Sequence, residues 1–270
     1  MVAAGRTRRR QTRHHPRMSD LRTRIRAGET LLGCFADLAS PMAAELLGSA
    51  GFDWAVLDLE HGESTEADLL PMLYAVETTS MTAIVRVPSA ERLRVGRALD
   101  LGAAGIMLPQ LQSIDGVLEA VSYLRYPPVG QRGVALRTRG GGMGSLGHAD
   151  VARMVNERIV GIVQIESAGT VADADAIAAL DEVDVLFVGP ADLSHNLGVP
   201  GRFDDPTYLA ALDAVVAACH AHGKEAGILI YDAAVLARHL ELGFRFIGLG
   251  SVGAFVSAGA RAMLGAAGRA

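Results

Sequence analysis

The stretch Trp54-Ala-Val-Leu-Asp-Leu-Glu-His61-Gly62 begins as an apolar run and ends in a cluster of titratable groups. An apolar run of this length, bounded by polar residues, is typical of a β-strand that is buried on both faces. Asp58, Glu60 and His61 follow at its carboxyl end, where parallel α/β proteins bind their ligands. A carboxylate three residues before an imidazole can fix its tautomer and raise its basicity, so we expect Asp58 to orient His61. A solvated loop with two acids and a surface histidine is the alternative explanation.

The same alternation of short apolar runs with helical segments recurs from residue 18 onward. Eight such units in about 250 residues predict a (β/α)8 TIM barrel, with a doubly wound open sheet as the alternative. No predicted strand is followed by G-x-G-x-x-G, so a dinucleotide site has little support. The predicted strands are residues 31–36, 54–58, 83–87, 105–109, 160–166, 184–189, 225–230 and 245–249. The predicted helices lie near residues 41–50, 65–77, 91–101, 113–124, 168–180, 206–222, 232–242 and 252–264.

The amino-acid composition limits the cellular locations and the binding partners that are expected for this chain. Residues 1–17 contain six arginines and no acid, and we expect a disordered extension there, followed by a single barrel domain at 18–270. The formal net charge of −5 argues against nucleic acid as the main partner. The two cysteines, Cys34 and Cys219, have no zinc or redox spacing, which favours a reducing cytoplasm. No uninterrupted apolar run is long enough to span a bilayer, so we expect no membrane partner.

Residues 125–158 form the one long connection between a predicted helix and the next strand. They contain Tyr126-Pro127-Pro128 and the glycine-rich run 140–144, and we expect an irregular loop. By barrel topology this loop leaves from the face opposite the active site. Because connections of this length usually have a function or are disordered, we hypothesise that it packs on a neighbouring subunit.

Charged and amide side chains also follow other predicted strands, and in a closed barrel these strand ends converge on one mouth. Glu166 and Asp192 come from adjacent strands and suit a hard divalent cation better than Zn²⁺, with acids exposed on the rim as the alternative. Arg86 can bind a carboxylate or an enolate oxygen through its planar fork, with a structural ion pair as the alternative. Further polar residues near strand ends are Asp100, Gln110 and Gln164.

These motifs resemble the HpcH/HpaI aldolase family, the metal-dependent class II pyruvate aldolases, over nearly all of residues 18–265. The resemblance implies a (β/α)8 barrel that cleaves 4-hydroxy-2-oxoacids to pyruvate and an aldehyde, with Mg²⁺, Mn²⁺ or Co²⁺ as cofactor. It also implies a homo-oligomer, typically a hexamer whose barrels exchange the last helix. Because decarboxylation of oxaloacetate makes the same pyruvate enolate, we expect it as a second reaction of this site. The residues that carry the resemblance are Gly51-Phe-Asp-Trp54, Asp58-x-Glu-His61, Arg86, Leu99-Asp100-x-Gly102-Ala103, Arg125-Tyr-Pro-Pro128 with Gly130-x-Arg132-Gly133, Gln164-Ile-Glu166 and Phe187-Val-Gly-Pro-Ala-Asp192-Leu193.

The resemblance implies a role for each site residue. Glu166 and Asp192 look like the metal ligands, His61 like the base paired with Asp58, and Arg86 like the stabiliser of the pyruvate enolate. Gln164 is expected near the waters on the metal or the substrate oxo group, and Asp100 is expected among the catalytic residues, as a partner that supports the groups in contact with the substrate. The backbone of Gly189, Pro190 and Ala191 is expected to receive the pyruvate carboxylate, and Phe35 and Leu229 to line the pocket. Phe35 stands where several relatives have Trp, and the loop 136–147 also departs from the family pattern, so the aldehyde that is accepted stays open.

An aldolase can stabilise an enolate by one of two routes, an imine formed on a lysine or a bound metal ion. The position of the lysines in the sequence distinguishes these routes. Lys224 is the only lysine, and it precedes the seventh predicted strand, away from the mouth. If the chain is an aldolase, the residues therefore favour the metal route.

Three other functions stay open at this point. An acyl-CoA lyase of the malyl-CoA or citryl-CoA type shares the barrel and the acidic metal site. A phosphosugar isomerase-type barrel could bind phosphate at Gly248-Leu-Gly-Ser251, although a tight turn explains that motif more simply. The third alternative is not an enzyme but a barrel without catalytic activity that serves as a binding scaffold for a partner.

Overall fold

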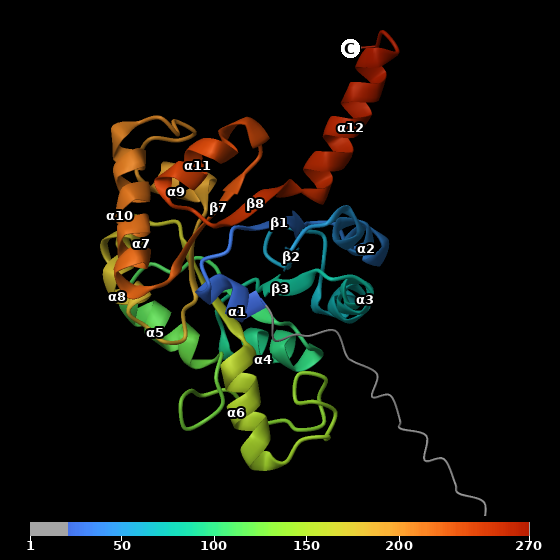
Figure 1. The fold of residues 1–270 in the computed structure, drawn as a ribbon, viewed down its shortest axis with the longest axis vertical. Coiled ribbons are helices and arrows are strands. Elements are labelled where there is room, and N and C mark those ends of the chain that lie inside the picture. The colour runs from blue at the N-terminus through green and yellow to red at the C-terminus, as the bar shows by residue number, and fades with distance from the viewer. Residues whose placement is uncertain (1–20, 270) are drawn as a thin grey trace, which may run out of the picture.

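The computed structural model describes residues 21–269 and contains a closed barrel of eight parallel strands in the order β1 to β8 (Figure 1). The predicted (β/α)8 barrel is therefore confirmed, and every predicted strand lies within one or two residues of an observed one. The predicted extension at residues 1–17 lies outside the described residues. The strands are β1 (Leu31–Ala36), β2 (Trp54–Asp58), β3 (Thr82–Arg86), β4 (Gly105–Leu108), β5 (Val160–Ile165), β6 (Val185–Val188), β7 (Glu225–Ile230) and β8 (Phe246–Ser251).

Helices between the strands cover the outside of the barrel (Figure 1). Ser40, Ser113 and Asp205 cap three of them through their side chains, which gives backbone N–H groups at the helix start a partner. The helices are α1 (Leu21–Arg26), α2 (Pro41–Ala50), α3 (Glu66–Glu77), α4 (Arg92–Leu101), α5 (Ile114–Ser122), α6 (His148–Arg158), α7 (Ala168–Ala172), α8 (Ala174–Ala178), α9 (Pro190–Asn196), α10 (Pro206–His222), the 3₁₀ helix η1 (Ala233–Val235), α11 (Leu236–Leu242) and α12 (Val252–Ala266).

Three helices, α1, α6 and α9, were not predicted, and the predicted helix 168–180 is divided into α7 and α8. α6 lies in the segment 125–158 that was expected to be irregular, and it packs through the buried side chains of Val151 and Val155, one turn apart. Its N-cap is Gly147, which has no side chain to mark a helix start. α9 directly follows β6, and its seven residues are too few for a clear helical periodicity. The observed connection between α5 and α6 is therefore shorter than predicted.

Aromatic side chains fill the barrel interior. The ring of Trp54 stacks on Phe246 with centroids 4.1 Å apart, and Phe187 meets both rings edge-on at 6.3 Å. Gly33 makes this packing fit, because a Cβ there would lie 2.0 Å from the Trp54 ring. The middle of the barrel is thus a packed core, and a ligand can enter only at an end.

α1 contributes to the N-terminal end of the barrel. Leu21 and Ile25 are buried in the same interior cluster as Trp54. Arg22 donates from Nε to both carboxylate oxygens of Asp184, the residue just before β6, at 2.8 and 3.0 Å. With the N-terminal end covered in this way, the C-terminal ends of the strands form the open mouth.

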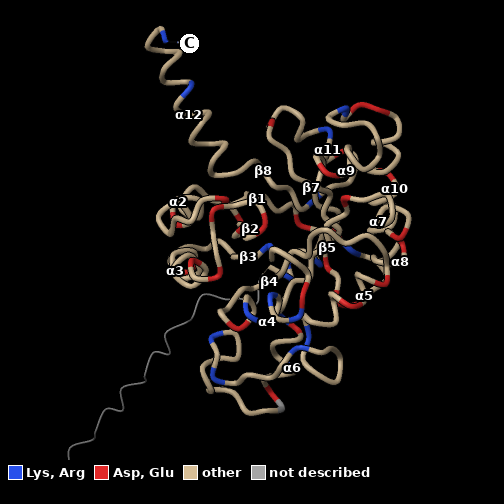
Figure 2. Tube along the Cα trace, turned by 180° about the vertical axis from the view of Figure 1, so that it is seen from behind, with Lys and Arg blue, Asp and Glu red and all other residues tan. Residues whose placement is uncertain are grey.

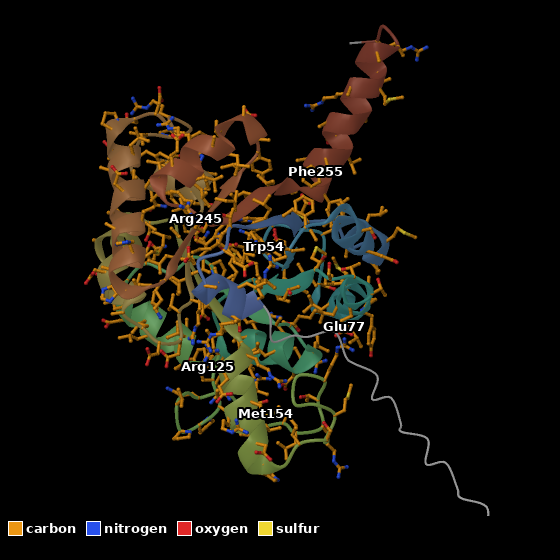
Figure 3. The ribbon with its side chains drawn as sticks, viewed as in Figure 1. Trp54, Glu77, Arg125, Met154, Arg245 and Phe255 are labelled. Carbon is orange, nitrogen blue, oxygen red and sulfur yellow. The ribbon has the colours of Figure 1, made fainter. Side chains whose placement is uncertain are left out.

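The last helix differs from the others because it projects away from the barrel (Figure 1). Val252 is its only buried residue, and Phe255 lies where the helix leaves β8 (Figure 3). Most of α12 carries neither acidic nor basic side chains (Figure 2). In the part of the chain that the structure describes, no helix combines the length and the apolar character needed to cross a membrane.

Candidate active site

Asp58 and Arg86 form a buried ion pair at the mouth of the barrel. The register of β2 on β3 sets these two residues side by side. Arg86 donates from Nε to Asp58 Oδ1 at 2.8 Å and from Nη2 to Oδ2 at 2.6 Å. Burial alone would raise the pKa of Asp58, but the hydrogen bonds and charge of Arg86 outweigh it and hold this pKa below its usual value. The pair is therefore charged, and it fixes the guanidinium at the mouth.

His61 is not oriented by Asp58 as the sequence predicted. Asp58 Oδ1 accepts the backbone N–H groups of Glu60 and His61, at 3.0 and 3.4 Å, and its side chain is otherwise engaged by Arg86. The His61 ring lies instead 3.8 Å from Glu60 Oε1, and its side chain is 60% exposed. The turn after β2 thus directs the Asp58 carboxylate inward and leaves the imidazole accessible from the cavity.

Glu166 lies buried directly after β5 and is an unusual carboxylate. Its Oε1 accepts the backbone N–H of Gln110 at 2.5 Å, and its Oε2 accepts from Gln164 Nε2 at 3.2 Å. Burial raises the pKa of Glu166 to about 7, and the charges of Glu60 and Asp192 add to the increase against the opposing effects of Gln110 and Arg86. Glu60 and Asp192 are therefore close enough to repel the carboxylate of Glu166 at this end of the barrel.

Gly189 allows the chain after β6 to pass close to Glu166. A Cβ at Gly189 would lie 2.9 Å from Glu166 Oε2 and 3.5 Å from Gln164 Nε2. The first turn of α9 then presents Asp192 to the same cavity. Glu166 and Asp192 thus lie on the same rim and within electrostatic range of each other, as the proposed shared ligand requires.

A cavity of about 700 Å³ opens at this end and continues outward along β7 towards α10 and α11. Glu166 is not in its wall but lies behind Gln164 and Gly189. The ring of Phe35 faces Arg86, whose Cζ lies 5.0 Å from the ring centroid. The predicted site residues that line the cavity are Phe35, Asp58, His61, Arg86, Gln164, Gly189, Pro190, Ala191, Asp192 and Leu229.

Asp100 is the predicted site residue that the structure does not bring to the mouth. It lies near the end of α4, just before β4, and therefore at the N-terminal end of the barrel. Its Oδ1 accepts from Arg132 Nη2 at 2.8 Å. The helix that follows β3 runs back along the barrel, so a residue at the end of that helix is far from strand C-termini. Within one chain, Asp100 therefore cannot contact a substrate at the mouth.

The donor set fits a divalent cation of the Mg²⁺ type. Within residues 21–269, no three His, Cys, Asp or Glu side chains form a ready-made metal cluster. Mg²⁺ needs only one or two carboxylates, however, because it keeps several of its waters. Gln164 Oε1 is buried and makes no hydrogen bond to any described residue. Two carboxylates and one unsatisfied amide oxygen on the same rim suit a hydrated divalent ion.

Two contributors to the site had no assigned role in the sequence prediction. Glu60 was noted only as part of the cluster after β2, yet its Oε2 lies 3.1 Å from Arg86 Nη1. Gln110 acts through its backbone N–H and has a left-handed φ of 56°. The acidic cluster was a signal for Glu60, whereas a backbone contact of this kind leaves no residue pattern.

Comparison with known proteins agrees with this geometry. The sequence model described as HpcH/HpaI aldolase/citrate lyase matches residues 31–258. The chain is 39% identical over 235 residues to the 5-keto-4-deoxy-D-glucarate aldolase of Klebsiella pneumoniae subsp. pneumoniae, covering 87% of this chain and 91% of that protein. It is 40% identical over 232 residues to the protein of the same name from Salmonella paratyphi C, covering 86% and 90%.

A solved structure agrees as well. The crystal structure of an HpcH/HpaI aldolase/citrate lyase family protein from Burkholderia cenocepacia J2315 superposes with a TM-score of 0.87 at 35% identity, over 92% of this chain and 99% of that one. The predicted aldolase function, a carbon–carbon lyase, is confirmed, and the acyl-CoA lyase and scaffold alternatives are not favoured. The chain belongs to the HpcH/HpaI aldolase/citrate lyase family.

Proposed function

We propose that this chain cleaves a 4-hydroxy-2-oxoacid to pyruvate and an aldehyde, with a divalent cation held by Glu166 and Asp192. The observation that carries the proposal is the buried carboxylate of Glu166, which lies within repulsive range of Glu60 and Asp192 and has no ion pair of its own among the described residues. A cation between the acids would remove this repulsion. Mg²⁺, Mn²⁺ or Co²⁺ would supply positive charge that stabilises the negative oxygen of an enolate.

The residues around the acids suit the oxoacid half of such a substrate. Arg86 is fixed by Asp58 and presents its guanidinium to the cavity, where it would hold the developing enolate charge. Gln164 is buried in the cavity wall and would lie near the 2-oxo group. The backbone at Gly189 and Ala191 would receive the carboxylate.

His61 is the group that we assign to proton transfer. Its accessible ring would take the proton from the 4-hydroxyl as the C3–C4 bond breaks, which releases the aldehyde. The bonding electrons remain on C3 and become the pyruvate enolate, and protonation at C3 then gives pyruvate. Decarboxylation of oxaloacetate would form the same enolate, so we expect this second reaction.

The only lysine supports the metal route. Lys224 lies just before β7, at the N-terminal end of the barrel, and its Nζ donates to the carbonyl oxygens of Leu180 and Val183 at 2.8 and 2.7 Å. An imine at Lys224 would form at the wrong end of the barrel. Stabilisation of the enolate therefore falls to the cation and Arg86.

The relatives favour a sugar-acid substrate. Read from its keto end, 5-keto-4-deoxy-D-glucarate is a 4-hydroxy-2-oxoacid with a second carboxylate, and proteins about 40% identical carry its name. We propose a substrate of this class. The cytoplasmic location stays a prediction.

We also propose that the chain functions as a homo-oligomer. α12 exposes Phe255, Val256, Met263 and Leu264, and contact with another copy would bury this apolar surface. An exchanged last helix and a hexamer, both predicted from the family, are consistent with this. The predicted role of Asp100 also depends on the oligomer, because the carboxylate cannot reach the mouth of its own barrel.

The experiment that tests the function is pyruvate release from a panel of 4-hydroxy-2-oxoacids. Activity should be lost in EDTA and return with Mg²⁺, Mn²⁺ or Co²⁺. Full activity in EDTA would refute the metal role, and no pyruvate from any substrate would refute the aldolase reaction.

A further inference from the structure

The side of the cavity formed by β7, β8 and β1 has no part in the steps described above. The oxoacid half is assigned to groups on or directly after β2, β3, β5 and β6, and the segment after β4 contributes the backbone N–H of Gln110 that bonds Glu166. In the closed strand order, β7, β8 and β1 complete the ring. The aldehyde half of the substrate must therefore face these three strands, beyond the apolar side chains of Phe35 and Leu229.

Three of the polar side chains that line the cavity on this side lie at the ends of these strands, and Asp232, Arg238 and His239 line it from the segment after β7. Asp37 follows β1, Tyr231 follows β7, and Ser251 ends β8. Asp37 Oδ1 accepts the backbone N–H of Gly253 at 2.9 Å, and Ser251 Oγ accepts that of Ala254 at 3.3 Å. Both groups are therefore engaged by the first turn of α12.

Tyr231 lines the cavity, and 68% of its surface is exposed. Partial burial and the charge of Asp37 raise the pKa of Tyr231, whereas a side-chain hydrogen bond with Ser251 lowers it. A bond that lowers a phenol pKa is one donated to its oxygen, because it stabilises the phenolate. When Ser251 donates to the oxygen of Tyr231, the O–H of Tyr231 is available to a ligand.

We propose that Tyr231 is a specificity-determining residue whose phenol donates a hydrogen bond to an oxygen on the carbon next to the aldehyde group. The site then prefers α-hydroxy aldehydes to alkyl aldehydes, because an alkyl group in this place leaves the phenol without a partner. The inference rests on the proposed aldol reaction and adds the residue that recognises the second product.

The test is aldol addition of pyruvate to glycolaldehyde and to propanal, with Mn²⁺ present. These aldehydes differ by a hydroxyl in place of a methyl group. The variants are Tyr231→Phe and, as a matched control, Tyr123→Phe, which removes a phenol oxygen that bonds Glu119 at 2.6 Å on the outside of the barrel. The glycolaldehyde-to-propanal ratio of kcat/KM should fall about tenfold in Tyr231→Phe and stay unchanged in Tyr123→Phe. The different intrinsic reactivities of the aldehydes cancel when this ratio is compared between proteins.

The outcomes separate this inference from the proposed function. A structural disturbance would lower both rates together, so an unchanged ratio in Tyr231→Phe, with the wild type active, overturns the inference alone. A wild type that neither joins pyruvate to an aldehyde nor decarboxylates oxaloacetate overturns the aldolase proposal, and this inference falls with it.

Discussion

Asp58 and Arg86 are register partners on adjacent strands, and their side chains meet through two hydrogen bonds of 2.8 and 2.6 Å. Both side chains are less than one-tenth exposed. Two hydrogen bonds to Asp58 fix the orientation of the planar Arg86 guanidinium. Its third nitrogen, Nη1, therefore stays near Glu60 and the cavity. The strand register therefore determines where positive charge is available at the mouth.

Asp58→Asn should destabilise the protein by about 3–5 kcal/mol, because it leaves the buried guanidinium of Arg86 without its charged partner. The measurement is urea unfolding at pH 7. The matched control is Glu66→Gln, which removes the acid of the exposed pair Arg94–Glu66 at 2.6 Å and should cost no more than about 1 kcal/mol. Similar losses in the two variants would show that the Asp58–Arg86 pair is not the buried anchor described here.

Glu166 should make the metal-free protein less stable as the pH rises. The folded protein holds this proton up to a pKa of about 7, whereas the reference carboxyl loses it near 4.5. Between these values the folded state binds more protons, so stability decreases with pH, by at most about 3 kcal/mol. In EDTA, Glu166→Gln should therefore gain stability relative to the wild type between pH 5 and pH 8. Parallel pH dependences of the two proteins would contradict the raised pKa.

The affinity of the protein for a divalent metal ion should depend on the carboxylates of Glu166 and Asp192. Glu166→Gln and Asp192→Asn should each weaken Mn²⁺ binding by calorimetry, since each removes one charged oxygen ligand. Binding to the wild type should also weaken below about pH 7, where the proton competes at Glu166. Asp204→Asn is the matched control, because Asp204 lines the outer cavity and has no assigned ligand role. Equal Mn²⁺ affinity in all four proteins would place the cation elsewhere.

The fold was predictable because each strand is buried on both faces and reads as a short apolar run. β2 was predicted at Trp54–Asp58 and is observed with those bounds. α6 was missed because a glycine stands at its N-cap and a glycine-rich run precedes it. Local patterns therefore find elements that bury a regular face, and they miss short helices with unmarked ends.

The sequence predicted which residues form the site, but not which of their side chains contact one another. Sequence spacing suggested that Asp58 orients His61, whereas strand register gives Asp58 to Arg86. Contacts between strands depend on register, which a single sequence does not display. Asp100 was misplaced for a related reason, because closeness to a strand in sequence does not tell which end of the barrel a residue occupies.

Lys224→Met should keep pyruvate release within about twofold of the wild type, as expected for a residue remote from the chemistry. Its ammonium bonds two carbonyl oxygens at the end of the barrel away from the cavity. Borohydride treatment of the wild type with pyruvate should leave the protein mass unchanged. A pyruvate-derived mass increase on Lys224 would replace the metal mechanism by an imine.

Met263→Glu should weaken self-association, because Met263 is 74% exposed on the projecting helix α12. Burial of a methionine contributes about 1.5–3 kcal/mol, and a buried unpaired carboxylate opposes contact further. The particle mass by light scattering should fall towards that of a smaller assembly or a single chain. Arg269→Glu, which adds negative charge beyond the end of the same helix, controls for charge alone and should leave the mass unchanged. If the wild type already has the mass of one chain, the exposed face of α12 has another partner and the homo-oligomer proposal is wrong.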